Sequence, residues 1–432
     1  MKFINKSQFI LSIIFILCFS CEKPHFSFEK DSLNAIIGKF VQKASHPFIH
    51  VRLEDRYGHV IYEHNSVNQN FLPDQKIDGQ TLMRIWSMSK IVTISLFMDL
   101  VEDQIVSLDD PVIEYLPEFS NLYVATDANG NSLTMVDSIS KICPHELRLN
   151  TSEMTLRHLI NHEAGFYYAT TQNQCINSKM AEVNLPKAMN SDDLINRFAK
   201  LPLIQRPGDS HFYGTNTTIL GLVSERATGK DLNELIQSRM TGPLRITGLK
   251  YNLEPDEKLL PRFSGKDDIL RFANDGDFDI FGPDFPSNRP ENKIFLGGEG
   301  MIASSDGYCD FLRMLMNYGE LNHKQFLKPG TVEEITSPQT QLDNDWGYNG
   351  YNLWVTSDTL RKLGYGDREL WQGGGYEGTE FWIDSRRGFV GVKMSQLHPI
   401  PKSGHEFYNE FRGEVYRQIF AFEEKYGKAI RF

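Results

Sequence analysis

A serine and a lysine three residues apart stand at the beginning of a long apolar stretch. Ser87-Met88-Ser89-Lys90 is followed by the apolar run 91–101, which predicts a buried helix. Residues three apart lie on the same face of a helix, so the hydroxyl and the amine should be neighbours. A serine becomes an effective nucleophile when an adjacent base takes its proton, and the positive end of the helix dipole favours an alkoxide. The spacing therefore indicates nucleophilic catalysis by Ser87, assisted by Lys90.

A tyrosine further along the chain carries a second group that this chemistry needs. Tyr213 follows the turn Pro207-Gly208, and Asn216 comes three residues later. A tyrosine close to a cation can act as a general base, and Lys90 is the obvious cation. We expect Tyr213 to face Ser87, and Asn216 to orient Lys90 or a substrate carbonyl.

Three consecutive glycines precede a predicted strand in the C-terminal third. Gly373, Gly374 and Gly375 leave the backbone bare, so a ligand can approach it closely, and we expect them to contact substrate. A backbone N–H at the end of this run can join the N–H of Ser87 in an oxyanion hole.

The elements that must position these residues are strands at both ends of the chain and helices between them. Residues 46–65 read as a β-hairpin, as do residues 124–135. Strands are predicted at 351–357, 379–384 and 389–396, and a closing helix at 407–425. Residues 190–245 are mostly helical. This order predicts an α+β fold: one antiparallel sheet built from both chain termini and flanked by helices, with an inserted, mostly helical subdomain and the site between them.

Taken together, these motifs resemble the serine β-lactamase and penicillin-binding-protein-like family, in its class C-like branch. That branch includes DD-peptidases, family VIII carboxylesterases and β-lactamase-related serine hydrolases. The resemblance extends from about residue 33 to 420 and implies a β-lactamase/transpeptidase-like fold. Its motifs, in chain order, are Ser87-Met88-Ser89-Lys90, Leu108-Asp109-Asp110-Pro111, Tyr115-Leu116-Pro117, 155–162, Gly165, Pro207-Gly208, Tyr213, Leu220-Gly221, 297–304, Gly374-Gly375 and Gly378-Thr379.

The resemblance implies a role for each of these residues. Ser87 would be acylated, Lys90 and Tyr213 would share the proton transfers, and Tyr376 would supply the second oxyanion N–H. No metal or organic cofactor is implied. The expected reaction is two-step hydrolysis of an ester or amide carbonyl in a small molecule or peptide, and we expect a monomer.

Two departures from the family pattern bear on the substrate. The tyrosine motif is often Tyr-x-Asn, whereas here Asn216 stands one place later, as in esterase-type members. Gly373 occupies the place of a Lys, His or Trp, and a Lys there helps to bind the carboxylate of β-lactams and peptides. We therefore favour an ester-like substrate. The alternatives are a DD-peptidase or β-lactamase, and a non-catalytic envelope protein that binds ligands in the same cleft.

The N-terminus predicts export. Lys2 and Lys6 precede the apolar segment 9–19, which ends at Ser20-Cys21 and is too short to span a bilayer. The segment resembles a lipoprotein signal with Cys21 as the lipidated residue. We expect a signal peptide at 1–21, a tether and first helix at 22–45, and the hydrolase domain at 33–425, held on the membrane of a bacterial cell envelope.

Other signals narrow the function. The net charge is −11 with no basic stripe, so we do not expect nucleic acid as a partner. Apart from the N-terminal segment the cysteines are Cys143, Cys175 and Cys309; at most one disulfide can join them, and we favour buried or free thiols. His158 and His162 have the spacing of metal ligands on a helix, but no third ligand is apparent. Phe278, Phe281 and Phe285 are expected to pack in the core.

Overall fold

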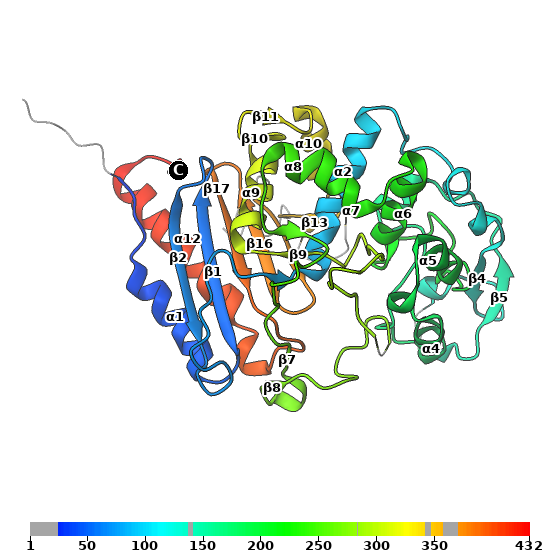
Figure 1. Cartoon of the computed structure of the whole chain (residues 1–432), viewed down its shortest axis with the longest axis horizontal. Helices are drawn as coiled ribbons and strands as arrows, with labels where there is room; N and C mark the ends of the chain where they lie inside the picture. Colours follow the sequence, from blue (N-terminus) through cyan, green and yellow to red (C-terminus); the bar gives the residue numbers. More distant parts are fainter. Residues whose placement is uncertain (1–24, 137–140, 283, 342–346, 357–369) are drawn as a thin grey trace, which may run out of the picture.

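The computed structural model describes residues 25–136, 141–282, 284–341, 347–356 and 370–432. Its main sheet has eight antiparallel strands in the order β12-β13-β14-β15-β16-β17-β1-β2 (Figure 1). These strands are β1 (Phe48–Asp55), β2 (Val60–Val67), β12 (Thr340–Gln341), β13 (Gly347–Asn349), β14 (Trp354–Thr356), β15 (Leu370–Gly375), β16 (Thr379–Asp384) and β17 (Phe389–Met394). The pairing of β1 with β17 joins the two ends of the chain in one sheet, which confirms the predicted α+β architecture.

Helices cover both faces of this sheet. Helices α1 (Lys30–Gln42) and α12 (Phe407–Tyr426) pack against one face, and α9 (Ser305–Met316) packs against β17 on the other (Figure 1). Strand β1 is therefore enclosed on both sides, and seven of its eight residues are buried, with only Arg52 partly exposed. The apolar side chains of α1, α12 and the outer face of β1 form a core of their own, separate from the larger core that surrounds the site.

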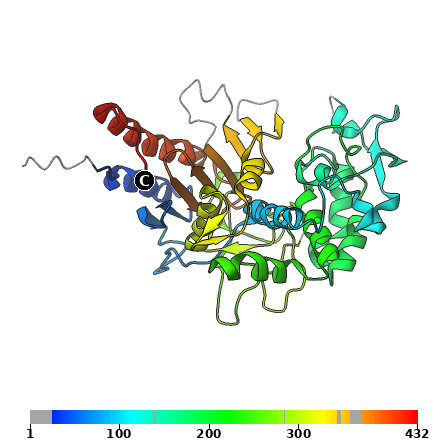
Figure 2. The same cartoon turned by 90° about the horizontal axis from the view of Figure 1, so that it is seen from above.

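The long buried helix α2 (Ser89–Glu102) lies between the sheet and a group of helices from the middle of the chain (Figure 2). Those elements are α3 (Leu156–Ile160), α4 (Gln174–Val183), α5 (Ser191–Phe198), α6 (Asn216–Thr228), α7 (Leu232–Leu235), the π-helical turn Ile236–Thr241 and α8 (Gly242–Leu244). Helix α10 (Pro329–Thr336) follows α9. The inserted, mostly helical subdomain is thus confirmed, and α2 joins it to the sheet.

The remaining short strands form one three-stranded sheet and three pairs. They are β3 (Met83–Arg84) and β6 (Leu249–Lys250) on either side of β9 (Ile302–Ala303); β4 (Tyr123–Thr126) with β5 (Glu146–Leu149); β7 (Phe263–Ser264) with β8 (Arg271–Phe272); and β10 (Glu320–Leu321) with β11 (Lys324–Gln325). The prediction of a hairpin at 124–135 is wrong about the strand that pairs with β4. The chain turns at Gly130, but only a single bridge, between Thr126 and Ser132, links the two sides of this turn. The strand that pairs with β4 is β5.

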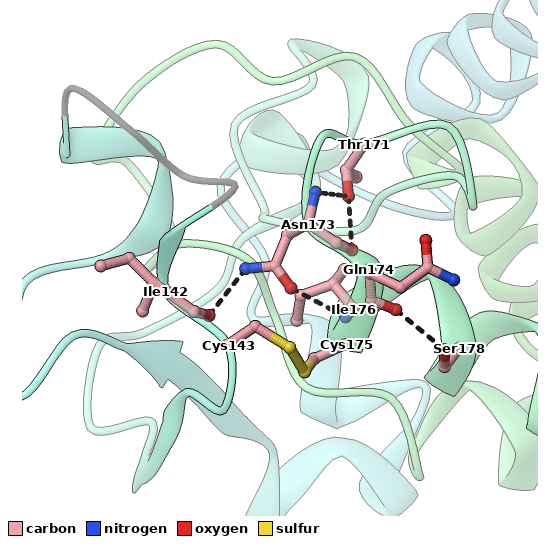
Figure 3. The surroundings of a disulfide bond; sticks show 8 residues. All are labelled: Ile142, Cys143, Thr171, Asn173, Gln174, Cys175, Ile176 and Ser178. Atoms are coloured by element: carbon pink, nitrogen blue, oxygen red, sulfur yellow. Dashed lines mark hydrogen bonds between the residues drawn. A yellow bond between two sulfur atoms is a disulfide. The ribbon is translucent and has the colours of Figure 1, made fainter.

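A disulfide joins Cys143 to Cys175 and ties the segment after residue 140 to the first turn of α4 (Figure 3). Asn173 reinforces the same link, because its side chain caps α4 at the Ile176 N–H and donates to the Ile142 carbonyl at 2.8 Å. The expectation of free thiols is wrong for these two cysteines. Cys309 is buried and free.

The predicted signal segment and Cys21 lie outside the described residues. None of the helices within the described ranges combines the length and apolar character that a bilayer span requires.

Candidate active site

Ser87 lies in a short helical turn, Trp86–Met88, that leads directly into α2. Trp86 has a φ of 47°, a left-handed conformation that a bulky residue rarely adopts. Such strain persists only where the surroundings enforce it, and it is found at functional sites. The turn places Ser87 at the positive end of α2, as the sequence predicts, and the serine borders two cavities.

Lys90 lies one turn further along and is fully buried. Its Nζ atom is 3.1 Å from Ser87 Oγ, which brings the two residues of the predicted pair into hydrogen-bond contact. The same nitrogen donates to the Tyr168 hydroxyl at 2.7 Å and to the Gly298 carbonyl at 2.9 Å, and it lies 3.3 Å from Glu299 Oε1. Lys90 is thus held from several elements and not by its own helix alone.

Sequence reasoning missed Tyr168 and Glu299 as members of this site. The Tyr168 hydroxyl donates to Glu299 Oε1, and Thr218 Oγ1 donates to Glu299 Oε2 at 2.7 Å. Burial, then the nearby Glu299 and Tyr213, raise the pKa of Tyr168 well above its ordinary value, so its phenol stays protonated. Glu299 stands within the Gly297-Gly298-Glu299-Gly300 motif, which is the one signal that could have placed it beside the lysine.

Tyr213 projects into the site from the loop that precedes α6, with 42% of its surface exposed. Its ring lies 4.9 Å from Lys90 Nζ, in the position of a cation–π contact. It also stacks on the ring of His162, with centroids 4.9 Å apart, and it borders both cavities together with Ser87. The structure therefore brings Ser87, Lys90 and Tyr213 together.

His162 stacks on the ring of Tyr213 and is a neutral imidazole. Burial, followed by the charges of Lys90 and His211, lowers the pKa of His162 well below its ordinary value. Its Nδ1 accepts from Asn216 Nδ2 at 3.1 Å, so its Nε2–H donates to Asn352 Oδ1 at 3.1 Å. No group of three His, Cys, Asp or Glu side chains in the described part of the chain is arranged to hold a metal ion.

The placement of Asn216 corrects its predicted role. Its side chain is fully buried, donates to His162 and to the Phe166 carbonyl, and borders neither cavity. Asn216 is the first residue of α6, and the helix turns it away from Lys90 toward the interior. Its contact is with the ring on which Tyr213 stacks, and not with Lys90 or a substrate carbonyl.

The three glycines form the C-terminal half of β15, and the last of them lies close to the backbone that leads into the serine turn. A Cβ on Gly375 would stand 2.3 Å from the carbonyl oxygen of Ile85, so only glycine allows this approach. The close passage brings Tyr376 beside the serine turn, where its ring lies 5.3 Å from that of Trp86. Ser87 and Tyr376, the two predicted oxyanion donors, border the same cavity.

Gly373 borders the smaller cavity, but a side chain at this position would meet an aromatic ring. It pairs with Phe381 across β15 and β16, and a Cβ at position 373 would lie 2.6 Å from the Phe381 ring. Any side chain at residue 373 would therefore overlap the Phe381 ring. A substrate carboxylate finds no cation at residue 373.

Two cavities meet at Ser87, Tyr213 and Gly374. The smaller, of about 160 Å³, has mostly apolar walls. The larger, of about 450 Å³, is more open. Their other lining residues are Ile91, His211, Asn352, Trp354, Gly373 and Phe381 for the smaller cavity, and Tyr168, Thr170, Ile280, Gly375, Tyr376, Gly378, Thr379, Glu380 and Ile400 for the larger.

The loop 262–295 reaches the larger cavity through Ile280. Phe278 and Phe281 are buried, as predicted for core residues, and Phe285 is partly buried. Arg262 lies over the rings of Phe278 and Phe285 and pairs with Glu377, which follows Tyr376 in the chain. The loop thereby packs against the segment that carries the second predicted oxyanion donor.

Several curated proteins are similar to this chain. ML-236A carboxylate methylbutanoyltransferase of Penicillium citrinum is 29% identical over 297 residues, which are 68% of this chain and 63% of that protein. Monacolin J acid methylbutanoyltransferase of Aspergillus terreus is 28% identical over 62% of this chain and 59% of its own length. The match thus spans about three fifths of these two transferases. Lovastatin esterase of Penicillium rubens is 24% identical over 85% of this chain and 94% of its own length.

Solved structures show the same fold at low identity. EstCE1, a hydrolase with promiscuous acyltransferase activity, superposes with a TM-score of 0.72 at 19% identity, covering 90% of this chain and 98% of that one. Simvastatin synthase of Aspergillus terreus superposes with a TM-score of 0.71 at 20% identity, covering 91% and 99%. The family described as Beta-lactamase matches residues 56–410, which include every residue of the site. The chain belongs to the Beta-lactamase family.

Proposed function

We propose that this protein is a serine hydrolase that acts through an acyl-enzyme, with Ser87 as the nucleophile and an ester as the favoured substrate. One observation carries the proposal: the Ser87 hydroxyl, 3.1 Å from the buried Lys90 amine, opens onto two cavities that also share Tyr213. A nucleophile within hydrogen-bond reach of an activating group and facing a ligand cavity is the arrangement that covalent catalysis requires.

The reaction proceeds in two steps. Ser87 Oγ attacks the substrate carbonyl, and its proton passes to the Lys90–Tyr213 pair. The N–H groups of Ser87 and Tyr376 bind the oxyanion, and the leaving alkoxide takes the proton as the ester bond breaks. Water, activated by Tyr213, then attacks the acyl-enzyme and releases the acid.

The walls of the site favour an ester with a short apolar acyl group. The smaller cavity, at about 160 Å³, is well below the roughly 300–1,000 Å³ of a typical ligand pocket. Ile91, Trp354 and Phe381 make its surface apolar, and Gly373 offers no cation to a carboxylate. A β-lactam or a cell-wall peptide would leave its carboxylate without that partner, which costs binding free energy.

The larger cavity favours transfer of the acyl group to an alcohol as a second activity. It also borders Ser87 and, at about 450 Å³, is large enough for a leaving or accepting alcohol to occupy. The names of the methylbutanoyltransferases and of EstCE1 record acyl transfer for those proteins. An alcohol bound there would compete with water for the acyl-enzyme.

Rates on two chromogenic substrates test the proposal. We expect the protein to hydrolyse p-nitrophenyl butyrate much faster than nitrocefin, and Ser87→Ala to abolish both reactions. Ser95→Ala is the matched control, because Ser95 is a buried serine of the same helix whose hydroxyl donates to the Ile91 carbonyl at 2.8 Å and which lines neither cavity. Faster turnover of nitrocefin would favour the β-lactamase alternative. Ligand binding without turnover, unaffected by Ser87→Ala, would favour the binding protein.

We also propose that the protein is exported to a bacterial envelope and lipidated at Cys21. The disulfide between Cys143 and Cys175 supports export, since such bonds persist in oxidising compartments. Metabolic labelling with an alkynyl fatty acid tests the anchor. The full chain should be labelled and sediment with membranes, whereas Cys21→Ser should not. Equal labelling of both would reject lipidation at this residue.

A further inference from the structure

The surroundings of Lys90 are those of a cation. The nitrogen contacts four oxygens within 3.3 Å, those of Ser87, Tyr168, Gly298 and Glu299. The carbonyl and the carboxylate can only accept, and the Tyr168 hydroxyl already uses its proton for Glu299. An ammonium supplies three N–H donors to these acceptors, whereas a neutral amine supplies only two and could accept only from the Ser87 hydroxyl.

Glu299 makes the neutral amine costly. Its side chain is fully buried, and Lys90 is the cation beside it. Tyr168 and Thr218 donate one hydrogen bond to each carboxylate oxygen, but both groups are neutral. If Lys90 lost its proton, the carboxylate would remain as an uncompensated buried charge, which destabilises the folded protein.

The other titratable groups that face Lys90 do not supply a positive charge that could balance Glu299. Tyr168 stays a phenol and His162 stays a neutral imidazole, because burial raises the pKa of the first and lowers that of the second. Tyr213 presents its ring to Lys90 Nζ at 4.9 Å and borders both cavities. Ser87 is then the partner of Lys90 whose own proton must leave during the reaction.

We infer that Glu299 is a positioning residue that holds Lys90 as an ammonium, so that Tyr213 and not Lys90 takes the proton of Ser87. This inference rests on the proposed function and deepens it. The Lys90 ammonium donates to Ser87 Oγ and stabilises the developing alkoxide. Tyr213, as phenolate, accepts the serine proton while the Ser87 oxygen bonds to the carbonyl carbon, and it returns that proton to the leaving alkoxide.

The charge of Lys90 can be observed without any turnover. In protein labelled with ¹³C at lysine Cε, the Lys90 resonance is the one that disappears in Lys90→Arg. We expect this resonance to have the shift of an ammonium at neutral pH in the wild type, and to move toward that of an amine in Glu299→Gln. An amine shift in the wild type at neutral pH, or equal behaviour of the two proteins, would overturn the inference.

Kinetics provide a second readout. Glu299→Gln keeps the shape of the side chain and removes its charge, so kcat for p-nitrophenyl butyrate should fall about 10- to 100-fold with KM nearly unchanged. Glu299→Asp should restore part of that loss, and the pH profile of Glu299→Gln should gain a limb that the wild type lacks. Wild-type kcat and pH profile in Glu299→Gln would contradict the assignment.

Glu225→Gln is the matched control. Glu225 is also a buried carboxylate, but it lies on α6 away from both cavities and accepts from the Leu232 N–H at 2.9 Å. It should keep the wild-type kcat. If Glu299→Gln does not fold, Glu299→Asp and the wild-type resonance still decide the charge of Lys90. A wild type without turnover would reject the proposed function alone, because the resonance reports on Glu299 independently.

Discussion

Lys90 and Lys393 are both buried, yet their surroundings differ. Lys90 contacts a nucleophile, a phenol, a carbonyl and a carboxylate, and through Ser87 it reaches the cavities. Lys393, on β17, donates to the Gly378 carbonyl at 2.6 Å and lies 3.9 Å from Glu380. Burial lowers the pKa of Lys393, and Glu380 offsets only part of that effect.

The difference shows that burial of an amine does not by itself make a catalytic site. Lys393 donates its hydrogen bond to the turn that follows β15, so it stabilises the segment that carries Tyr376. Lys90 shares its protons with a hydroxyl that faces a ligand cavity. We therefore assign a structural role to Lys393 and a chemical one to Lys90, and the variants below test that assignment.

Replacement of the two lysines should have the largest effect. Lys90→Met should lower kcat/KM for p-nitrophenyl butyrate by more than about 10³-fold, because Ser87 loses its activating neighbour. It should also destabilise the fold by about 3–5 kcal/mol, since Glu299 is left as a buried charge without a partner. Lys393→Met should keep activity within about tenfold and cost about 1–3 kcal/mol through the orphaned Gly378 carbonyl. Rates and urea unfolding measure both; similar losses of activity would erase the distinction.

The two tyrosines near Lys90 should also differ in their effect on catalysis. Tyr213→Phe should reduce kcat by about 10²- to 10⁴-fold, as expected for loss of a general base. Tyr168→Phe should reduce it less, because the high pKa of Tyr168 keeps that group a hydrogen-bond relay between Lys90 and Glu299. Pre-steady-state release of nitrophenol provides the measurement. A larger loss of kcat in Tyr168→Phe than in Tyr213→Phe would mean that Tyr168, and not Tyr213, transfers the proton.

A substitution at Gly373 tests whether the Phe381 ring leaves room for a side chain at this position. Gly373→Ala should destabilise the protein by about 1–3 kcal/mol, because the new methyl group overlaps the Phe381 ring. The double variant Gly373→Ala/Phe381→Leu should recover most of this loss, and thermal unfolding compares the three proteins. Additive losses in the double variant would mean that the ring is not the obstacle.

The smallest expected effect is on the pH dependence of the protein's stability, through the carboxylate of Glu225 outside the site. Burial raises the pKa of Glu225 from 4.5 to about 7. Between these values the folded protein keeps a proton that the unfolded chain has lost, so its stability falls as pH rises through this window and stays low above it. Glu225→Gln cannot titrate, and at pH 8 it should be more stable than the wild type by at most about 3 kcal/mol. Equal stability of the two proteins at both pH 4.5 and pH 8 would contradict this account.

The sequence predicts the parts of the site that depend on local spacing. Ser87 and Lys90 lie on one face of one helix, and the strands at both chain ends pair as their alternation indicates. Glu299 is brought to Lys90 across 209 residues by tertiary packing, which no local pattern reports. The pairing of Cys143 with Cys175 is equally undecided among three cysteines.

Errors in the prediction also have physical causes. Its closeness to Tyr213 in the chain predicts that Asn216 faces the site, but α6 begins at this residue and turns it inward. The sequence shows that a glycine at position 373 is unusual, whereas the reason for it depends on the register that places Gly373 opposite Phe381. Contacts set by strand register and helix rotation need the folded structure.

Intact mass of the protein, quenched soon after mixing with p-nitrophenyl butyrate, shows whether Ser87 is acylated. We predict a covalent adduct of one butyryl group, located on the peptide that contains Ser87 and absent from Ser87→Ala, with a matching burst of nitrophenol. An adduct on another residue, or ester turnover that survives Ser87→Ala in folded protein, would contradict it.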